Sequence, residues 1–89
     1  MKTIRLIIKG KVQGVFYRAS TKDTANKLGI KGWVRNLPDG NVEIMATAEQ
    51  QILYNFIMWC HQGPPKAIVD EVISEETEFR DFARFSITE

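Results

Sequence analysis

The chain has 89 residues, of which 44% are hydrophobic and 26% charged, a composition that suits one folded globular domain with a single core and excludes a disordered segment. The formal net charge of +1 gives no bulk electrostatic reason for binding to nucleic acid or to an acidic membrane. One cysteine excludes an internal disulfide and a cysteine metal cluster, and no apolar run approaches the about 20 residues that span a membrane, so we expect residues 1–89 to form one cytoplasmic domain.

The first half of the chain predicts a strand, a helix and a two-stranded hairpin. Residues 4–9 alternate between apolar and more polar side chains, which is typical of a strand with one buried face, and the charges within this run leave it too short for a signal peptide. A helix follows through Leu28 and ends at Gly29, a natural C-terminal cap. The Leu-Pro-Asp-Gly sequence at 37–40 has turn chemistry and joins the strands of a hairpin over residues 32–47.

The second half predicts another helix and two more strands. The Thr-Ala-Glu-Gln sequence at 47–50 has the capping-box pattern, so we expect its threonine to cap a helix with an apolar stripe from 52 to 60. A Gly-Pro-Pro sequence at 63–65 ends this helix, and strand-like runs follow at about 67–74 and 82–88. The resulting order is β-α-β-β-α-β with an extra C-terminal strand. It predicts an α+β, ferredoxin-like sandwich with two helices on one face of a mainly antiparallel sheet.

The connection from Gly10 to Arg18 is the segment that points to chemistry. Its glycines let backbone N–H groups approach a ligand, and the helix that follows presents its free N–H groups and positive dipole end at the same place. Arg18 adds a planar guanidinium that can bind two oxygens of a phosphate or carboxylate. These features favour a small-oxyanion site, although glycines are common between a strand and a helix and an early arginine is often only solvated. The loop is neither a Walker loop nor a Gly-x-Gly-x-x-Gly fingerprint, so a nucleotide is not indicated.

The spacing of the motifs is more specific than any one of them. In chain order they are Gly10-x-Val12-Gln13-Gly14-Val15-x-Tyr17-Arg18-x-x-Thr21, Gly32-Trp33-Val34-x-Asn36, Asp39-Gly40-x-Val42-Glu43 and Gly63-Pro64-Pro65. Over essentially the whole chain this pattern strongly resembles the acylphosphatase family. Tyr17 stands where that family usually has phenylalanine.

The resemblance implies a function and a set of site residues. It implies that the chain hydrolyses the carboxyl–phosphate bond of acyl phosphates, releasing a carboxylate and inorganic phosphate. Arg18 would bind the phosphate together with loop N–H groups, and Asn36 would position the attacking water. The loop residues concerned are Gly14, Val15, Phe16, Tyr17 and Arg18. From the residues alone, Asn36 can equally be a turn residue that bonds its own backbone.

The chemistry open to these residues is limited to binding and positioning. The motif contains no carboxylate, cysteine or histidine for the chemical step, and an asparagine amide cannot remove a proton at neutral pH. We therefore expect metal-independent, cofactor-free hydrolysis in which the proton goes to the phosphate of the substrate. The alternative is a non-catalytic module of the same fold that senses an anion or carbamoyl phosphate. An RNA-recognition motif is disfavoured because residues 41–46 carry no aromatic side chain to stack on a base.

Other residues are expected around or away from this site. Acyl phosphate and inorganic phosphate would be the partners of a monomer that binds neither nucleic acid nor membrane. Cys60 is expected in the core, and His61 at the end of the second helix. The aromatic side chains expected mostly in the core are Tyr54, Phe56, Trp59, Phe82 and Phe85. The cations expected near the site, where they would attract an anionic substrate, are Lys9, Lys11, Lys22 and Arg35.

Overall fold

Five strands and two helices make up the molecule, and the computed structural model describes all residues 1–89. In chain order the elements are β1 (Lys2–Lys11), α1 (Tyr17–Leu28), β2 (Lys31–Asn36), β3 (Val42–Ala48), α2 (Gln50–Gln62), β4 (Ile68–Thr77) and β5 (Phe85–Ile87). This order confirms the predicted one, including the extra C-terminal strand. Neither helix is long and apolar enough to cross a membrane.

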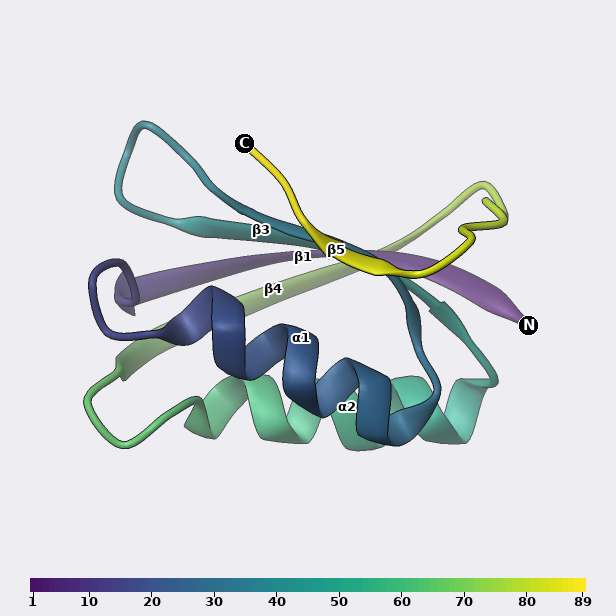
Figure 1. Cartoon of the computed structure of the whole chain (residues 1–89), viewed down its shortest axis with the longest axis horizontal. Helices are drawn as coiled ribbons and strands as arrows, with labels where there is room; N and C mark the ends of the chain where they lie inside the picture. The colour runs from purple at the N-terminus through teal and green to yellow at the C-terminus, as the bar shows by residue number, and fades with distance from the viewer.

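The strands form one sheet in the order β4-β1-β3-β2-β5. The pairs β1–β3, β1–β4 and β2–β3 are antiparallel, and only β2–β5 is parallel. Both helices lie on the same face of this sheet, side by side, and no helix covers the other face (Figure 1). The predicted ferredoxin-like sandwich is therefore confirmed.

The core lies between the sheet and the two helices. Strand alternation sends Leu6, Ile8 and Ile44 to the covered face, where each is fully buried. Phe56 of α2 meets them from the helix layer and packs edge-on against Phe85 of β5 with ring centroids 6.3 Å apart. Burial of each such side chain contributes about 1.5–3 kcal/mol, which is why the alternating pattern determines which face of each strand points inward.

The predicted capping box at the start of α2 is wrong. Thr47 lies inside β3, and its Oγ1 donates to the carbonyl of Arg80 at 2.8 Å and lies 2.6 Å from the hydroxyl of Thr3. Its hydroxyl is thus engaged on the far side of the sheet and is not available to the helix. The N-cap of α2 is Glu49, whose side chain makes no capping hydrogen bond.

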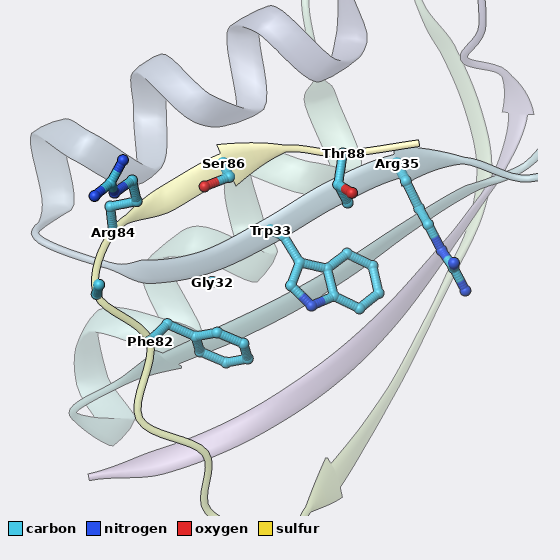
Figure 2. A pocket seen from close by; sticks show the side chains of 8 residues that line it. Gly32, Trp33, Arg35, Phe82, Arg84, Ser86 and Thr88 are labelled. Carbon is cyan, nitrogen blue, oxygen red and sulfur yellow. The ribbon is translucent and has the colours of Figure 1, made fainter.

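Two of the aromatic residues expected in the core lie outside it. Tyr54 is 58% exposed because it sits one residue past Leu53 and off the buried stripe of α2. Phe82 is only partly buried and borders a hollow on the uncovered face of the sheet (Figure 2). The segment from Glu78 to Arg84, which the sequence assigned partly to the last strand, is instead a connection that crosses toward β5.

Candidate functional site

The Gly10–Arg18 loop begins at an irregularity in the sheet. The register between β1 and β4 shifts between Lys9 and Gly10, where the backbone of Gly10 takes φ +129°. A Cβ atom at Gly10 would lie 2.2 Å from the carbonyl oxygen of Ile68, so only glycine allows the two strands to approach so closely. The chain then turns through Gly14 at φ +74° and Phe16 at φ +67° into α1. The two glycines therefore set the direction in which the loop leaves the sheet.

Backbone donors remain unpaired throughout the end of this loop. No N–H group of residues 14–18 donates to a backbone carbonyl, and the first donor in this region is Ser20, which bonds Phe16 at 3.0 Å. The N-cap residue Phe16 has no side chain that could satisfy them. Free N–H groups and the positive end of the helix dipole therefore point to the same place, as an oxyanion site requires.

Arg18 lies in the first turn of α1 and is half-buried. None of the ion pairs in the molecule includes it, so no carboxylate of the protein occupies its guanidinium. It lines a hollow of about 310 Å³ beside the loop, together with Gly14, Phe16, Tyr17 and other residues. The structure thus brings four of the predicted residues, Gly14, Phe16, Tyr17 and Arg18, to one hollow, whereas the Val15 side chain is buried in the core and does not line it.

Asn36 is the last residue of β2 and pairs with Val42 of β3. Alternation along β2 puts its side chain on the face of the fully buried Val34, which is the face that the helices cover. Its Oδ1 atom is buried and accepts no hydrogen bond from the protein. The interpretation of Asn36 as a turn residue bonded to its own backbone therefore does not hold. A buried acceptor without a donor costs about 1–3 kcal/mol, so this atom is a candidate acceptor for a ligand.

Gln13 links the loop to the strand end that carries Asn36. Its Nε2 group donates to the carbonyl oxygens of Leu37 at 2.8 Å and Asn41 at 2.9 Å. One NH₂ group supplies two donors, so a single side chain satisfies both acceptors. Gln13 has no separate role among the predicted site residues, although it is the only polar side chain between Lys11 and Tyr17. That isolated amide was the available signal for it.

Tyr17 anchors the start of α1 to the end of α2. Its hydroxyl donates to the carbonyl oxygen of Cys60 at 2.7 Å, and its ring packs against Trp59 with centroids 5.6 Å apart. Burial raises the pKa of the Tyr17 hydroxyl well above its ordinary value. Burial also raises the pKa of the Cys60 thiol to about 12. Both groups stay protonated near neutral pH, so neither supplies a nucleophile or a base at the loop.

The cations expected near the site are only partly there. Arg35 alternates with Val34, so it lies on the uncovered face, where its guanidinium contacts Glu43 at 2.6 Å. Arg5 holds the same carboxylate at 2.6 Å, and Glu43 is 4% exposed between them. The expectation for Arg35 is therefore wrong, for a reason that strand alternation supplies. Lys22 is exposed one helical turn after Arg18 and shares its side of α1.

A second hollow, of about 520 Å³, lies on the uncovered face between β2 and β5. Trp33 of β2 and Phe82 of the connection before β5 both line it, together with Gly32 and Arg84 (Figure 2). It contains neither Arg18, nor Asn36, nor any residue of the Gly10–Arg18 loop. The unpaired donors and the unpaired acceptor lie elsewhere, so the loop is the candidate site.

Comparisons with known proteins identify the family of this chain. The family profile described as Acylphosphatase matches residues 4–87. An acylphosphatase from Marinobacter nauticus is 56% identical over 81 residues, which cover 86% of this chain and 88% of that protein. The crystal structure of acylphosphatase from Bacillus subtilis superposes with a TM-score of 0.96 at 34% identity and covers 100% of both chains. The structure of an acylphosphatase from Coxiella burnetii has a TM-score of 0.95 at 38% identity and covers 98% of this chain and 92% of its own.

Proposed function

The chain belongs to the acylphosphatase family and hydrolyses acyl phosphates, and from this premise we propose that the Gly10–Arg18 loop binds the phosphoryl group while Asn36 orients the attacking water. One observation carries the proposal: the loop has N–H groups without acceptors, and the Oδ1 atom of Asn36 is a buried acceptor without a donor. The hydrogen bond from Gln13 to Leu37 ties the loop to the strand end that carries Asn36. Family membership favours this enzymatic role over a module that only senses an anion.

Binding of the phosphoryl group follows from the charges and donors at the loop. Its oxygens are negatively charged, and the first turn of α1 offers them N–H groups at the positive end of the helix dipole. Arg18 can donate two parallel hydrogen bonds to two of these oxygens, since no carboxylate competes for its guanidinium. The amides of Gly14, Val15, Phe16 and Tyr17 would complete the ring of donors.

The chemical step needs positioning more than a base. The oxygen of water forms a bond to phosphorus while the bond from phosphorus to the acyl oxygen breaks, and the carboxylate leaves with the electron pair. Oδ1 of Asn36 would accept a hydrogen bond from the water, but an amide cannot take the proton, which passes to a phosphoryl oxygen. Because a carboxylate is a good leaving group, orientation of the water and neutralisation of the phosphoryl charge can carry the reaction.

The setting of the reaction is part of the proposal. We propose that residues 1–89 act as one domain, as a monomer in the cytoplasm, with acyl phosphate and inorganic phosphate as partners and no nucleic acid or membrane. A net charge of +1 supports the absence of polyanionic partners. No three His, Cys, Asp or Glu side chains gather in a way that could hold a metal ion, which supports metal-independent hydrolysis. Full activity after treatment with a chelator is the expected result.

The role of Arg18 is tested by phosphate release from acetyl phosphate. We expect Arg18→Ala to lower kcat/KM by about 10²–10³-fold, the loss typical of removing one charge-stabilising donor. Inhibition by inorganic phosphate should weaken in the same variant. Arg84→Ala is the matched control because Arg84 is exposed and lines only the hollow on the uncovered face. Wild-type turnover in Arg18→Ala would reject the proposal.

A further inference from the structure

The hollow of about 520 Å³ on the uncovered face is lined by two aromatic side chains, Trp33 and Phe82 (Figure 2). Trp33 comes from β2 and Phe82 from the connection before β5, and both are only partly buried. Neither belongs to the hydrophobic core between the sheet and the helices. Aromatic side chains gathered at a surface are typical of places that contact a ligand or a partner. The two rings are therefore available to a ligand in the hollow.

The segment before β5, which forms one wall of this hollow, is fastened to the sheet at both ends. At Arg80 the carbonyl oxygen accepts a hydrogen bond of 2.8 Å from the Thr47 hydroxyl, and the backbone N–H donates to Oγ1 of Thr3 at 2.9 Å. At the other end, the N–H of Gly32 donates to the carbonyl oxygen of Arg84 at 3.0 Å. The wall is therefore in place before a ligand arrives, and a preformed site loses less conformational entropy on binding.

The charged side chains that line the hollow are both cations. They are Arg35 and Arg84, and no Asp or Glu lines it. Arg84 is exposed and takes part in none of the ion pairs of the molecule, so its guanidinium is free to bind an anion. Arg35 is held by Glu43 at 2.6 Å, and its guanidinium carbon lies 5.1 Å from the ring centroid of Trp33. A free cation and a fixed one thus adjoin the aromatic side chains.

The carboxylates of the sheet gather at its other edge. Asp70, Glu71, Glu75 and Glu76 all lie on β4, and the strand order puts β4 and β5 at opposite edges. The two strands that flank the hollow, β2 and β5, carry no carboxylate. Charges act on a small anion mainly within about 10 Å at moderate salt, so the local balance of charge matters more than the net charge of +1. The surroundings of the hollow therefore favour an anion.

We propose that this hollow is a second ligand site, separate from the phosphoryl site, and that it binds a planar aromatic anion, either an aryl carboxylate or an aryl phosphate. The ring of the ligand packs against Trp33 and Phe82, and its anionic group accepts hydrogen bonds from the guanidinium of Arg84. Ser86 and Thr88 also line the hollow and can donate from their hydroxyls to the same group. The volume lies within the about 300–1,000 Å³ typical of small-molecule sites.

The test is a titration with naphthoate, with naphthyl phosphate and with the uncharged naphthamide, followed by the nuclear magnetic resonance signals of the indole N–H groups. The chain has two tryptophans, Trp33 and Trp59, and only the first lines the hollow. We expect both anions to shift the Trp33 signal until it saturates, and naphthamide to bind at least about 10-fold more weakly. The anion that binds more tightly identifies the preferred charged group. Equal binding of naphthamide and the two anions, or no shift of the Trp33 signal, overturns the proposal.

Two variants test the ring and the charge separately. We expect Trp33→Leu and Arg84→Gln each to raise the Kd of naphthoate about 10-fold in calorimetry, the first by removing the stacking surface and the second by removing the cation. The matched controls are Tyr54→Leu and Lys66→Gln, which change an exposed aromatic residue and an exposed cation that do not line the hollow. Arg84 is exposed, so its variant tests the proposal even if Trp33→Leu does not fold. An unchanged Kd in Arg84→Gln, or in a folded Trp33→Leu, overturns the proposal.

The Arg18→Ala variant separates this site from the phosphoryl site. Arg18 lies in the first turn of α1 and does not line the hollow on the uncovered face. We therefore expect Arg18→Ala to bind naphthoate with the Kd of wild type. Loss of naphthoate binding in this variant would place the ligand at the loop and overturn the proposal.

Discussion

The side-chain amide of Gln13 donates a hydrogen bond of 2.8 Å to the carbonyl oxygen of Leu37, so the loop that carries the unpaired amides is fastened to the residue next to Asn36. A second bond of 2.9 Å from the same nitrogen to Asn41 reaches the other side of the β2–β3 connection. The bond to Leu37 joins residues 24 apart in sequence and ties together the two segments to which we assign phosphoryl binding and water positioning. On that assignment Gln13 acts as a positioning residue.

Replacement of Gln13 should separate chemistry from phosphate binding. We expect Gln13→Ala to lower kcat by about 10–100-fold, because small misplacements of a reacting group are costly, while the inhibition constant of inorganic phosphate changes little. Gln51→Ala is the control, since Gln51 donates only an exposed bond of 3.3 Å to Asn55 on α2. Steady-state kinetics with acetyl phosphate measure both constants. A parallel loss of phosphate inhibition and kcat would indicate that the loop itself has collapsed.

Replacement of Asn36 should reduce activity without reducing stability. Its Oδ1 is a buried acceptor without a donor, so Asn36→Ala removes an unfavourable group from the folded state. We expect kcat to fall by at least about 10²-fold, with a free energy of unfolding within about 1 kcal/mol of wild type or above it. Urea unfolding followed by circular dichroism measures the second quantity. A stability loss of several kcal/mol would mean that the side chain is structural.

The parts of the site that local sequence determines could be predicted. The glycines at 10 and 14 and the arginine in the first helical turn lie within nine residues, and turn geometry and helix polarity act at that range. Strand alternation also predicts the face on which Arg35 lies. Its neighbour Val34 is apolar and points to the core, so Arg35 must point to the opposite face of the sheet. Closeness to Asn36 along the chain therefore does not bring Arg35 to the same face of the sheet.

The remaining features depend on contacts between distant segments. Thr47 has the sequence context of a helix cap, but it lies in β3. Its hydroxyl points to the face of the sheet away from the helices, where it contacts the Thr3 hydroxyl and donates to the carbonyl of Arg80. Ile87 reaches the hollow beside Arg18 only because β5 returns to pair with β2 in parallel. A single sequence gives the propensity of each segment, whereas these contacts depend on how the segments pack.

Gly10 should tolerate no side chain. A Cβ there would lie 2.2 Å from the carbonyl oxygen of Ile68 and 2.8 Å from the amide nitrogen of Asp70, both backbone atoms that cannot move alone. We expect Gly10→Ala to lower the free energy of unfolding by more than about 3 kcal/mol. Gly40→Ala is the matched control: its φ is also positive, at +93°, but nothing lies within 4 Å, so only about 1 kcal/mol should be lost. Equal losses in urea unfolding would contradict the close approach of β1 and β4.

The buried thiol of Cys60 should make the fold sensitive to alkaline pH. Burial raises its pKa from the ordinary 9.0 to about 12. Above pH 9 the unfolded chain therefore binds fewer protons than the folded one, and stability decreases as pH rises. The protonated thiol makes its full contribution to the free energy of unfolding below about pH 9. This contribution is lost between about pH 9 and 12, with a slope of about 1.4 kcal/mol per pH unit. The raised pKa of the Tyr17 hydroxyl adds a loss of the same sign, beginning near its ordinary value of 10.0.

Urea unfolding of Cys60→Ala at pH 7, 9, 10 and 11 measures this effect. The variant should be less stable than wild type at pH 7, because it leaves a small cavity, but its stability should fall less steeply between pH 9 and 11. Tyr17→Phe keeps the ring and removes the second titrating group, so the double variant should show the shallowest slope of all. Turnover of Cys60→Ala at pH 7 should equal that of wild type, since a thiol with a pKa of about 12 stays protonated there and takes no part in the reaction. Identical slopes in wild type and variant would show that the thiol ionises as readily in the folded chain as in the unfolded one.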